Sequence, residues 1–174
     1  MTGTRVLVLA IAALAPVVAA CDDDEGPSDD ATVFSAVLTG DQEEPPVPTT
    51  ASGTADLSIE GDAITYTISV ADLANPVVAH IHIGEPGANG PVRLNLCGTG
   101  APVPGCTAGD GVLVTGTNGT TVGTPAITFD ELVEAMRSGG AYVNVHTDDG
   151  EGEQNTGPGD MASGEIRGQI VAEE

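Results

Sequence analysis

The sequence contains no lysine and no tryptophan, and its four arginines stand against 26 aspartates and glutamates. The resulting net charge of −22 leaves no basic surface to neutralise phosphates. This argues against nucleic acid as a partner and against electrostatic docking to anionic lipid headgroups. Aromatic residues are also few, two Tyr and two Phe. The core must therefore be built from Val, Ile, Leu and Ala, a composition that favours β-sheet packing.

The N-terminus is apolar with a single charge. Residues 1–20 combine Arg5 with a short apolar stretch and small residues, which is the pattern of a secretory signal peptide. The ending Val-Ala-Ala-Cys at 18–21 resembles a bacterial lipobox, so we expect Cys21 to carry a lipid; a transmembrane anchor and an ordinary cleaved signal are the alternatives. Residues 21–31 are acidic and are predicted to be a flexible tether, which leaves 32–174 as the domain. We expect an exported protein on the periplasmic or cell-surface side, held to the membrane by its lipid anchor only.

Cysteine is scarce as well, because only Cys97 and Cys106 remain besides Cys21. In an exported protein such a pair is expected to form a disulfide. Two free thiols or a metal-binding pair are the alternatives, but the spacing is too long for a CxxC-type metal knuckle. We predict a structural disulfide that closes the loop between the two residues.

Short alternating runs separated by Gly and Pro turns make up most of the domain. Apolar and polar residues alternate in 32–39, 53–60, 63–70, 77–83, 92–96, 111–115, 142–147 and 163–171. Residues 40–50 hold three prolines and are predicted to be a long surface connection. One short helix is expected after Thr128, which forms a capping-box pattern with Glu131. The sequence predicts an all-β fold, an antiparallel Greek-key sandwich or barrel with one short helix.

Histidine occurs only three times, at His80, His82 and His146. His80 and His82 lie two apart on one predicted strand and therefore point to the same side, and His146 ends another strand. Three imidazoles can hold copper or zinc. The alternative is a set of hydrogen-bonded structural histidines at a sheet rim that orient the turn at 87–90. The sequence leaves both interpretations open.

Other chemistry is thinly represented. The sequence has no Ser/His/Asp elbow, phosphate loop or nucleotide fingerprint. The acidic loop 148–160 offers oxygen ligands for Ca²⁺, which would suit a calcium-dependent adhesin, but it does not have the spacing of a known calcium loop. A solvated run of charges is the preferred interpretation of this loop.

Four segments are distinctive when taken together: residues 38–46, 79–92 and 141–147, and the motif Gly164-Glu165-Ile166-Arg167-Gly168. In this order they resemble the CHRD (chordin) domain, which occurs in bacterial secreted proteins and in the animal growth-factor antagonist chordin. Glu165 and Arg167 fall on one face of a strand, where they could pair or hold a loop; a structural role is preferred over a recognition or catalytic pair.

The resemblance implies a β-barrel similar to that of Cu/Zn superoxide dismutase, with no settled activity; an immunoglobulin-like sandwich is the alternative for the same pattern. By this resemblance His80 and His82 look like the copper-binding His-x-His pair, and His146 looks like the late copper histidine. No histidine remains for a bridging ligand or a zinc site, and no arginine is placed to guide superoxide. A dismutase of the known type is therefore not expected.

Two functions follow from these observations. The first is a lipid-anchored CHRD domain of the cell envelope that acts as a non-catalytic binding or structural module, with an unidentified envelope protein or extracellular ligand as its partner. The second is a copper- or zinc-binding protein, or a superoxide-dismutase-like oxidoreductase, that uses the three histidines.

Overall fold

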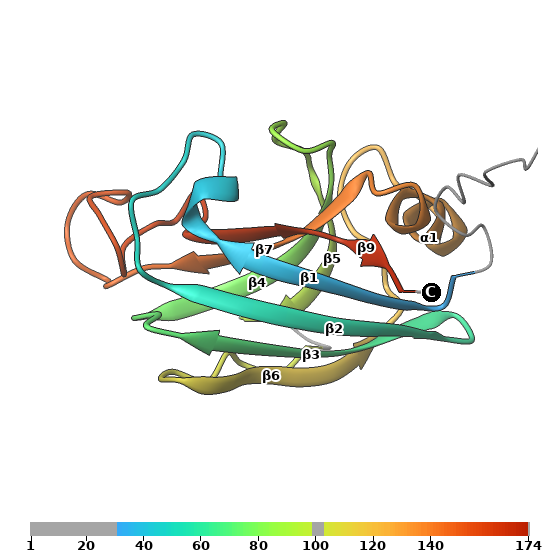
Figure 1. Cartoon of the computed structure of the whole chain (residues 1–174), viewed down its shortest axis with the longest axis horizontal. Coiled ribbons are helices and arrows are strands. Elements are labelled where there is room, and N and C mark those ends of the chain that lie inside the picture. Colours follow the sequence, from blue (N-terminus) through green and yellow to red (C-terminus); the bar gives the residue numbers. More distant parts are fainter. Residues whose placement is uncertain (1–30, 99–102, 174) are drawn as a thin grey trace, which may run out of the picture.

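The computed structural model describes residues 31–98 and 103–173 (Figure 1). The predicted signal peptide, Cys21 and the acidic tether as far as residue 30 lie outside the described residues. The elements in chain order are β1 (Val33–Thr39), the 3-10 helix η1 (Gly40–Gln42), β2 (Ser52–Glu60), β3 (Ala63–Ala71), β4 (Pro76–Ile83), β5 (Val92–Cys97), β6 (Gly111–Asn118), α1 (Phe129–Arg137), β7 (Ala141–Thr147), β8 (Ile166–Gln169) and β9 (Val171–Ala172).

The strands form one antiparallel sheet that curls into a nearly closed barrel. Its order is β5-β4-β7-β8-β1-β2-β3-β6, and β9 pairs with β1. The two edges approach each other where Leu94 bridges Thr121 and where the Asn118 amide donates to the Asn95 carbonyl. In Figure 1, β1, β2, β3 and β6 form one side of the barrel, and β4, β5 and β7 lie behind them. The predicted all-β antiparallel fold with one short helix is confirmed.

Strand alternation fills the barrel with aliphatic side chains. On β3, Ile64, Tyr66 and Ile68 point inward and are fully buried, and the polar residues between them face out. On β4 and β7 the inward residues are Ala79, Ile81, Val143 and Val145. The Tyr66 hydroxyl donates to the Leu96 carbonyl at 2.6 Å, so the two sides of the barrel are joined by a buried polar contact as well as by packing.

The single α-helix begins as its sequence predicts. The Thr128 hydroxyl accepts from the Glu131 amide, and the Glu131 carboxylate accepts from the Thr128 amide, which completes a capping box. Leu132 and Met136 on one side of the helix are buried against the core. Among the described residues no helix is long and apolar enough to cross a membrane.

The predicted disulfide between Cys97 and Cys106 is present and ties the end of β5 to the segment before β6. Most strands begin and end within one residue of the expected positions, but β6 and the last predicted strand differ more. β6 continues to Asn118, and the last predicted strand is divided into β8 and β9. Residues 163–165 are not part of β8, because the chain turns there with Gly164 at a φ of +123°. The predicted surface connection 40–50 contains η1 and buries the Glu43 side chain.

Candidate metal centre

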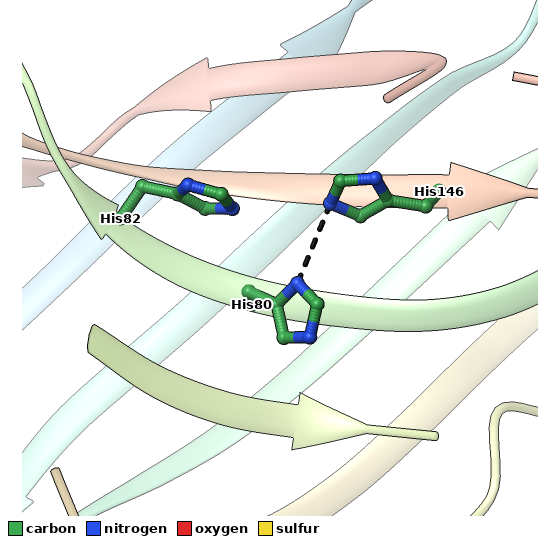
Figure 2. A group of neighbouring side chains, drawn as sticks. All are labelled: His80, His82 and His146. Atoms are coloured by element: carbon green, nitrogen blue, oxygen red, sulfur yellow. Dashed lines mark hydrogen bonds between the residues drawn. The ribbon is translucent and has the colours of Figure 1, made fainter. Parts of the chain in front are cut away.

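The three histidines gather on the outer face of β4 and β7. His80 and His82 project from β4, and His146 projects from the end of β7, which pairs with β4 so that Val78 lies opposite His146. Because β4 and β7 send their aliphatic residues inward, the imidazoles share the opposite side of the sheet. Their ligand nitrogens all lie within 4.8 Å of one another. Figure 2 shows the three rings converging from the two strands.

Hydrogen bonds to backbone carbonyls fix two of the rings. His82 Nδ1 lies 2.9 Å from the Gly90 carbonyl oxygen, and His146 Nδ1 lies 3.0 Å from the Ala162 carbonyl oxygen. A carbonyl only accepts, so each Nδ1 carries the proton and each Nε2 carries a lone pair. Backbone carbonyls that hold the outer nitrogen of an imidazole are a usual feature of metal-binding histidines.

One pair of inner nitrogens has the spacing of two ligands on a common ion. His80 Nδ1 lies 3.4 Å from His146 Nε2, the contact drawn in Figure 2. Two nitrogens bound to one tetrahedral zinc are about 3.3–3.4 Å apart. His82 Nε2 is buried and has no hydrogen-bond partner among the described residues. The residues present therefore fit a copper or zinc ion held by His80 Nδ1, His82 Nε2 and His146 Nε2.

The environment of the cluster keeps the imidazoles neutral. Burial, and to a smaller extent the neighbouring His146 and His82, lower the pKa of His80 to about 4. Burial also lowers the pKa of His82 to about 4 against the opposing effect of the Gly90 carbonyl, and it lowers the pKa of His146. A neutral imidazole is the form that binds a metal ion, so these rings need to lose no proton at neutral pH.

A stack of side chains leads from the histidines to Arg167. Tyr142, on the middle strand β7, packs its ring against His82 with centroids 4.8 Å apart. The Arg167 guanidinium from β8 lies 3.5 Å from the centre of the same Tyr142 ring. Arg167 also donates to the Glu85 carbonyl at 3.0 Å, which holds the turn after β4. The positive charge of Arg167 contributes to the lowered pKa of His82.

Glu43 also belongs to this face, although the sequence did not identify it as a site residue. It comes from the segment after η1 and is 5% exposed. Desolvation raises the pKa of Glu43 to about 7, against the opposing effects of the Arg167 charge and the Asn144 amide. Asn144 donates to Glu43 Oε2 at 3.4 Å, while Glu43 Oε1 has no partner among the described residues. Asn144 could have been found from its place two residues before His146, whereas Glu43 lies in a connection with no periodic pattern.

The Gly-Glu-Ile-Arg-Gly motif (residues 164–168) packs against these buried polar residues. A Cβ on Gly164 would lie 2.6 Å from Asn144 and 2.7 Å from Glu43, so only glycine fits there. Glu165 accepts hydrogen bonds from Thr49, Thr147 and the Gly159 amide, each at 2.7 Å. Glu165 thus joins three segments of the chain. Among the described contacts it is not paired with Arg167, which contacts the Glu85 carbonyl and the Tyr142 ring instead.

The match to known families covers the whole of this region. No curated protein is similar enough to match the chain. Residues 34–170 match the CHRD domain, a stretch that runs from β1 to the residue before β9. It includes the three histidines, Glu43 and the Gly-Glu-Ile-Arg-Gly motif. The chain therefore belongs to the CHRD domain family.

Proposed function

We propose that this protein is an exported, lipid-anchored CHRD domain that binds a copper or zinc ion through His80, His82 and His146. The observation that carries the proposal is the convergence of three ring nitrogens within 4.8 Å, one of them buried without a hydrogen-bond partner. Copper and zinc are the ions that imidazole ligands suit. The metal is the ligand of the module, and binding is its function.

A purely structural role for the histidines accounts for only part of the geometry. The bonds from His82 to Gly90 and from His146 to Ala162 would serve to orient loops. They use one nitrogen of each of these two rings. Of the inner nitrogens, His80 Nδ1 and His146 Nε2 are hydrogen-bonded to each other, whereas His82 Nε2 is buried without a partner among the described residues. Burying such an atom costs free energy, and a bound cation would remove that cost.

Binding is favoured over dismutation of superoxide. Three protein ligands leave one position open on a tetrahedral metal, which suits either binding or catalysis. The arginines of the described segments donate to backbone carbonyls: Arg93 to that of Pro125, Arg137 to that of Ala31 and Arg167 to that of Glu85. With a net charge of −22 the chain repels a small anionic substrate.

Metal analysis of natively exported protein tests the proposal. We expect about one copper or zinc ion per chain in the wild type and none in the His80→Ala, His82→Ala double variant. Because the surface is strongly acidic, Asp148→Asn, Asp149→Asn serves as the control, and it should keep the ion. Equal metal content in the wild type and the histidine variant, both folded by circular dichroism, would overturn the proposal.

The lipid anchor is tested separately. The lipobox-like ending at Cys21 supports attachment of the exported domain to a membrane. We expect the wild type to enter the detergent phase on Triton X-114 partition and the Cys21→Ser variant to remain in the aqueous phase. If the Cys21→Ser variant partitions like the wild type, the proposed lipid anchor is contradicted, whereas the proposed metal site is not.

A further inference from the structure

A second group of potential ligands lies in the loop between β7 and β8, which extends from one end of the barrel in Figure 1. Asp148 and Asp149 follow directly after β7, and Asp160 comes later in the same loop. The fold brings carboxylate oxygens of all three to within 4.8 Å of one another. Oxygens bound to one Ca²⁺ at 2.3–2.6 Å lie at most about 5 Å apart, so the spacing fits a common ion.

Asp160 distinguishes this group from an ordinary acidic surface. Its side chain is 4% exposed, although it is a carboxylate in a polar loop. Oδ2 accepts from the Thr156 amide at 3.1 Å and from the Thr156 hydroxyl at 2.6 Å. Oδ1 is buried and has no hydrogen-bond partner among the described residues. A buried carboxylate oxygen is costly unless a donor or a cation faces it.

Within residues 31–98 and 103–173, no cationic side chain is hydrogen-bonded to this oxygen. The sequence has no lysine, and Arg93, Arg137 and Arg167 donate to backbone carbonyls elsewhere. The other two carboxylates can still accept. Asp148 receives the Gly150 amide and the Gln154 side chain, and Asp149 receives the Glu151 amide. A carboxylate has about four lone-pair positions, so these bonds leave room for a metal ion.

We propose that Asp148, Asp149 and Asp160 bind a hard divalent cation of the calcium type, at a site separate from the three histidines. All three side chains offer oxygen, which Ca²⁺ prefers and which copper and zinc use less than imidazole. Water and carbonyl oxygens of this glycine-rich loop would complete a coordination number of six to eight. The sequence favoured a solvated run of charges because the loop lacks the spacing of a known calcium loop. Folding supplies the third ligand from a distant part of the loop.

The position of the site gives the cation a structural effect. The Asp148 amide donates to the Asn75 carbonyl, and the Met161 amide donates to the Thr147 hydroxyl, so the loop is anchored at both ends of the cluster. A bound ion would neutralise the repulsion among the three carboxylates and fix the loop against the end of β7. We therefore expect Ca²⁺ to raise the melting temperature of the protein.

The experiment uses the mature exported protein in detergent, stripped of metals with EDTA and dialysed into 0.1 M NaCl. We expect 10 mM CaCl₂ to raise the melting temperature by about 3–8 °C, as for a site with a Kd of about 10⁻⁴–10⁻³ M. Calorimetric titration should give one Ca²⁺ per chain. The same Ca²⁺ response is expected in the His80→Ala, His82→Ala variant, which separates this site from the histidine cluster.

Asp160→Asn is the decisive variant. The asparagine keeps an oxygen that can accept from Thr156, and it removes the buried charge. Without calcium this variant should therefore melt at or above the melting temperature of the wild type. Calcium should no longer raise its melting temperature. The matched control Glu153→Gln removes one charge from the same loop outside the cluster and should respond like the wild type. The proposal is overturned if Asp160→Asn and Glu153→Gln respond equally, which would indicate diffuse binding to the acidic surface, or if the wild type does not respond at all.

Discussion

Residues alternate between inward and outward positions on both sides of the barrel, but the outward residues differ: on one side they face water, and on the other most of them are buried. On β3 and β6 most outward residues are small or polar, with Val112 as an exposed apolar exception. Threonine hydroxyls pair on this surface: Thr65 with Thr117 at 3.0 Å and Thr67 with Thr115 at 3.2 Å. These residues remain in contact with water. They satisfy their hydrogen bonds there, so this face needs no partner.

On β4, β7 and β8 the outward residues are large, polar and covered. His82, Asn144, His146 and Arg167 are all buried, although they point away from the aliphatic core. The covering segments come from the connection after η1, the turn after β4 and the loop before β8, which contribute Glu43, Gly90 and Ala162 to the contacts.

The consequence is a concentration of unsatisfied polar atoms on one side of the molecule. Among the described residues, His82 Nε2, Glu43 Oε1, Asn144 Oδ1 and Arg167 Nη1 are buried without partners and belong to this covered face. Native proteins tolerate few such atoms, and those that persist commonly mark function. The buried polar atoms of the β4–β7–β8 face therefore support the metal site proposed there, and the threonine face has no comparable group among the described residues.

Replacing Arg167 should destabilise the covered face more than replacing Glu43 or the histidines. Arg167→Met removes the cation that offsets the buried Glu43 and the stacking on Tyr142, so we expect unfolding free energy at pH 8 to fall by about 3–5 kcal/mol. Thr67→Val on the exposed face should change it by no more than about 0.5 kcal/mol. Urea denaturation measures both. Similar losses for the two variants would mean that the two faces do not differ energetically.

Glu43 offers a sharper test, because its effect depends on pH. Its pKa is raised from 4.5 to about 7 on folding, so the folded state holds a proton that the unfolded state releases between these values. Stability from this group is complete below pH 4.5 and is lost as pH rises through 7, by at most about 3 kcal/mol. Glu43→Gln has no such titration. Its stability relative to the wild type should increase from pH 5 to pH 8 in urea denaturation; a constant difference would contradict the raised pKa.

Some features of the fold and of the site could be predicted from the sequence, and others could not. Alternation predicted the strands because each strand has one aliphatic face in a single core, and the capping box located the helix because it is a local hydrogen-bond pattern. The pairing of β4 with β7 brings His146 to the other two histidines, as the sequence predicted. The sequence left open whether the three rings hold a metal ion or are structural. Glu43 and the burial of Asp160 were missed, because both depend on loops folding back over the sheet, and loop conformation leaves no period in the sequence.

The histidine cluster should show the reverse pH dependence of Glu43. Folding lowers the pKa of His80 and His82 from 6.5 to about 4, so in metal-free protein the stability present above pH 6.5 is lost as pH falls through 4. We expect His80→Ala, His82→Ala to reduce this acid loss by about 2 kcal/mol, less than the separate shifts imply because the rings interact and His80 is only partly buried.

The stability of the histidine variant and that of Glu43→Gln can each be compared with the wild type over a range of pH. All three proteins share every other titrating group, so the contribution of those groups cancels. Between pH 4 and pH 8 in EDTA, the pH of maximum stability should move upward in Glu43→Gln and downward in the histidine variant. Shifts in the same direction would show that the two clusters do not titrate as their burial requires. Opposite shifts would show that Glu43 and the imidazoles of His80 and His82, on one face of the sheet, are all neutral near pH 6. Imidazoles kept neutral in this way can bind a metal ion without first losing a proton.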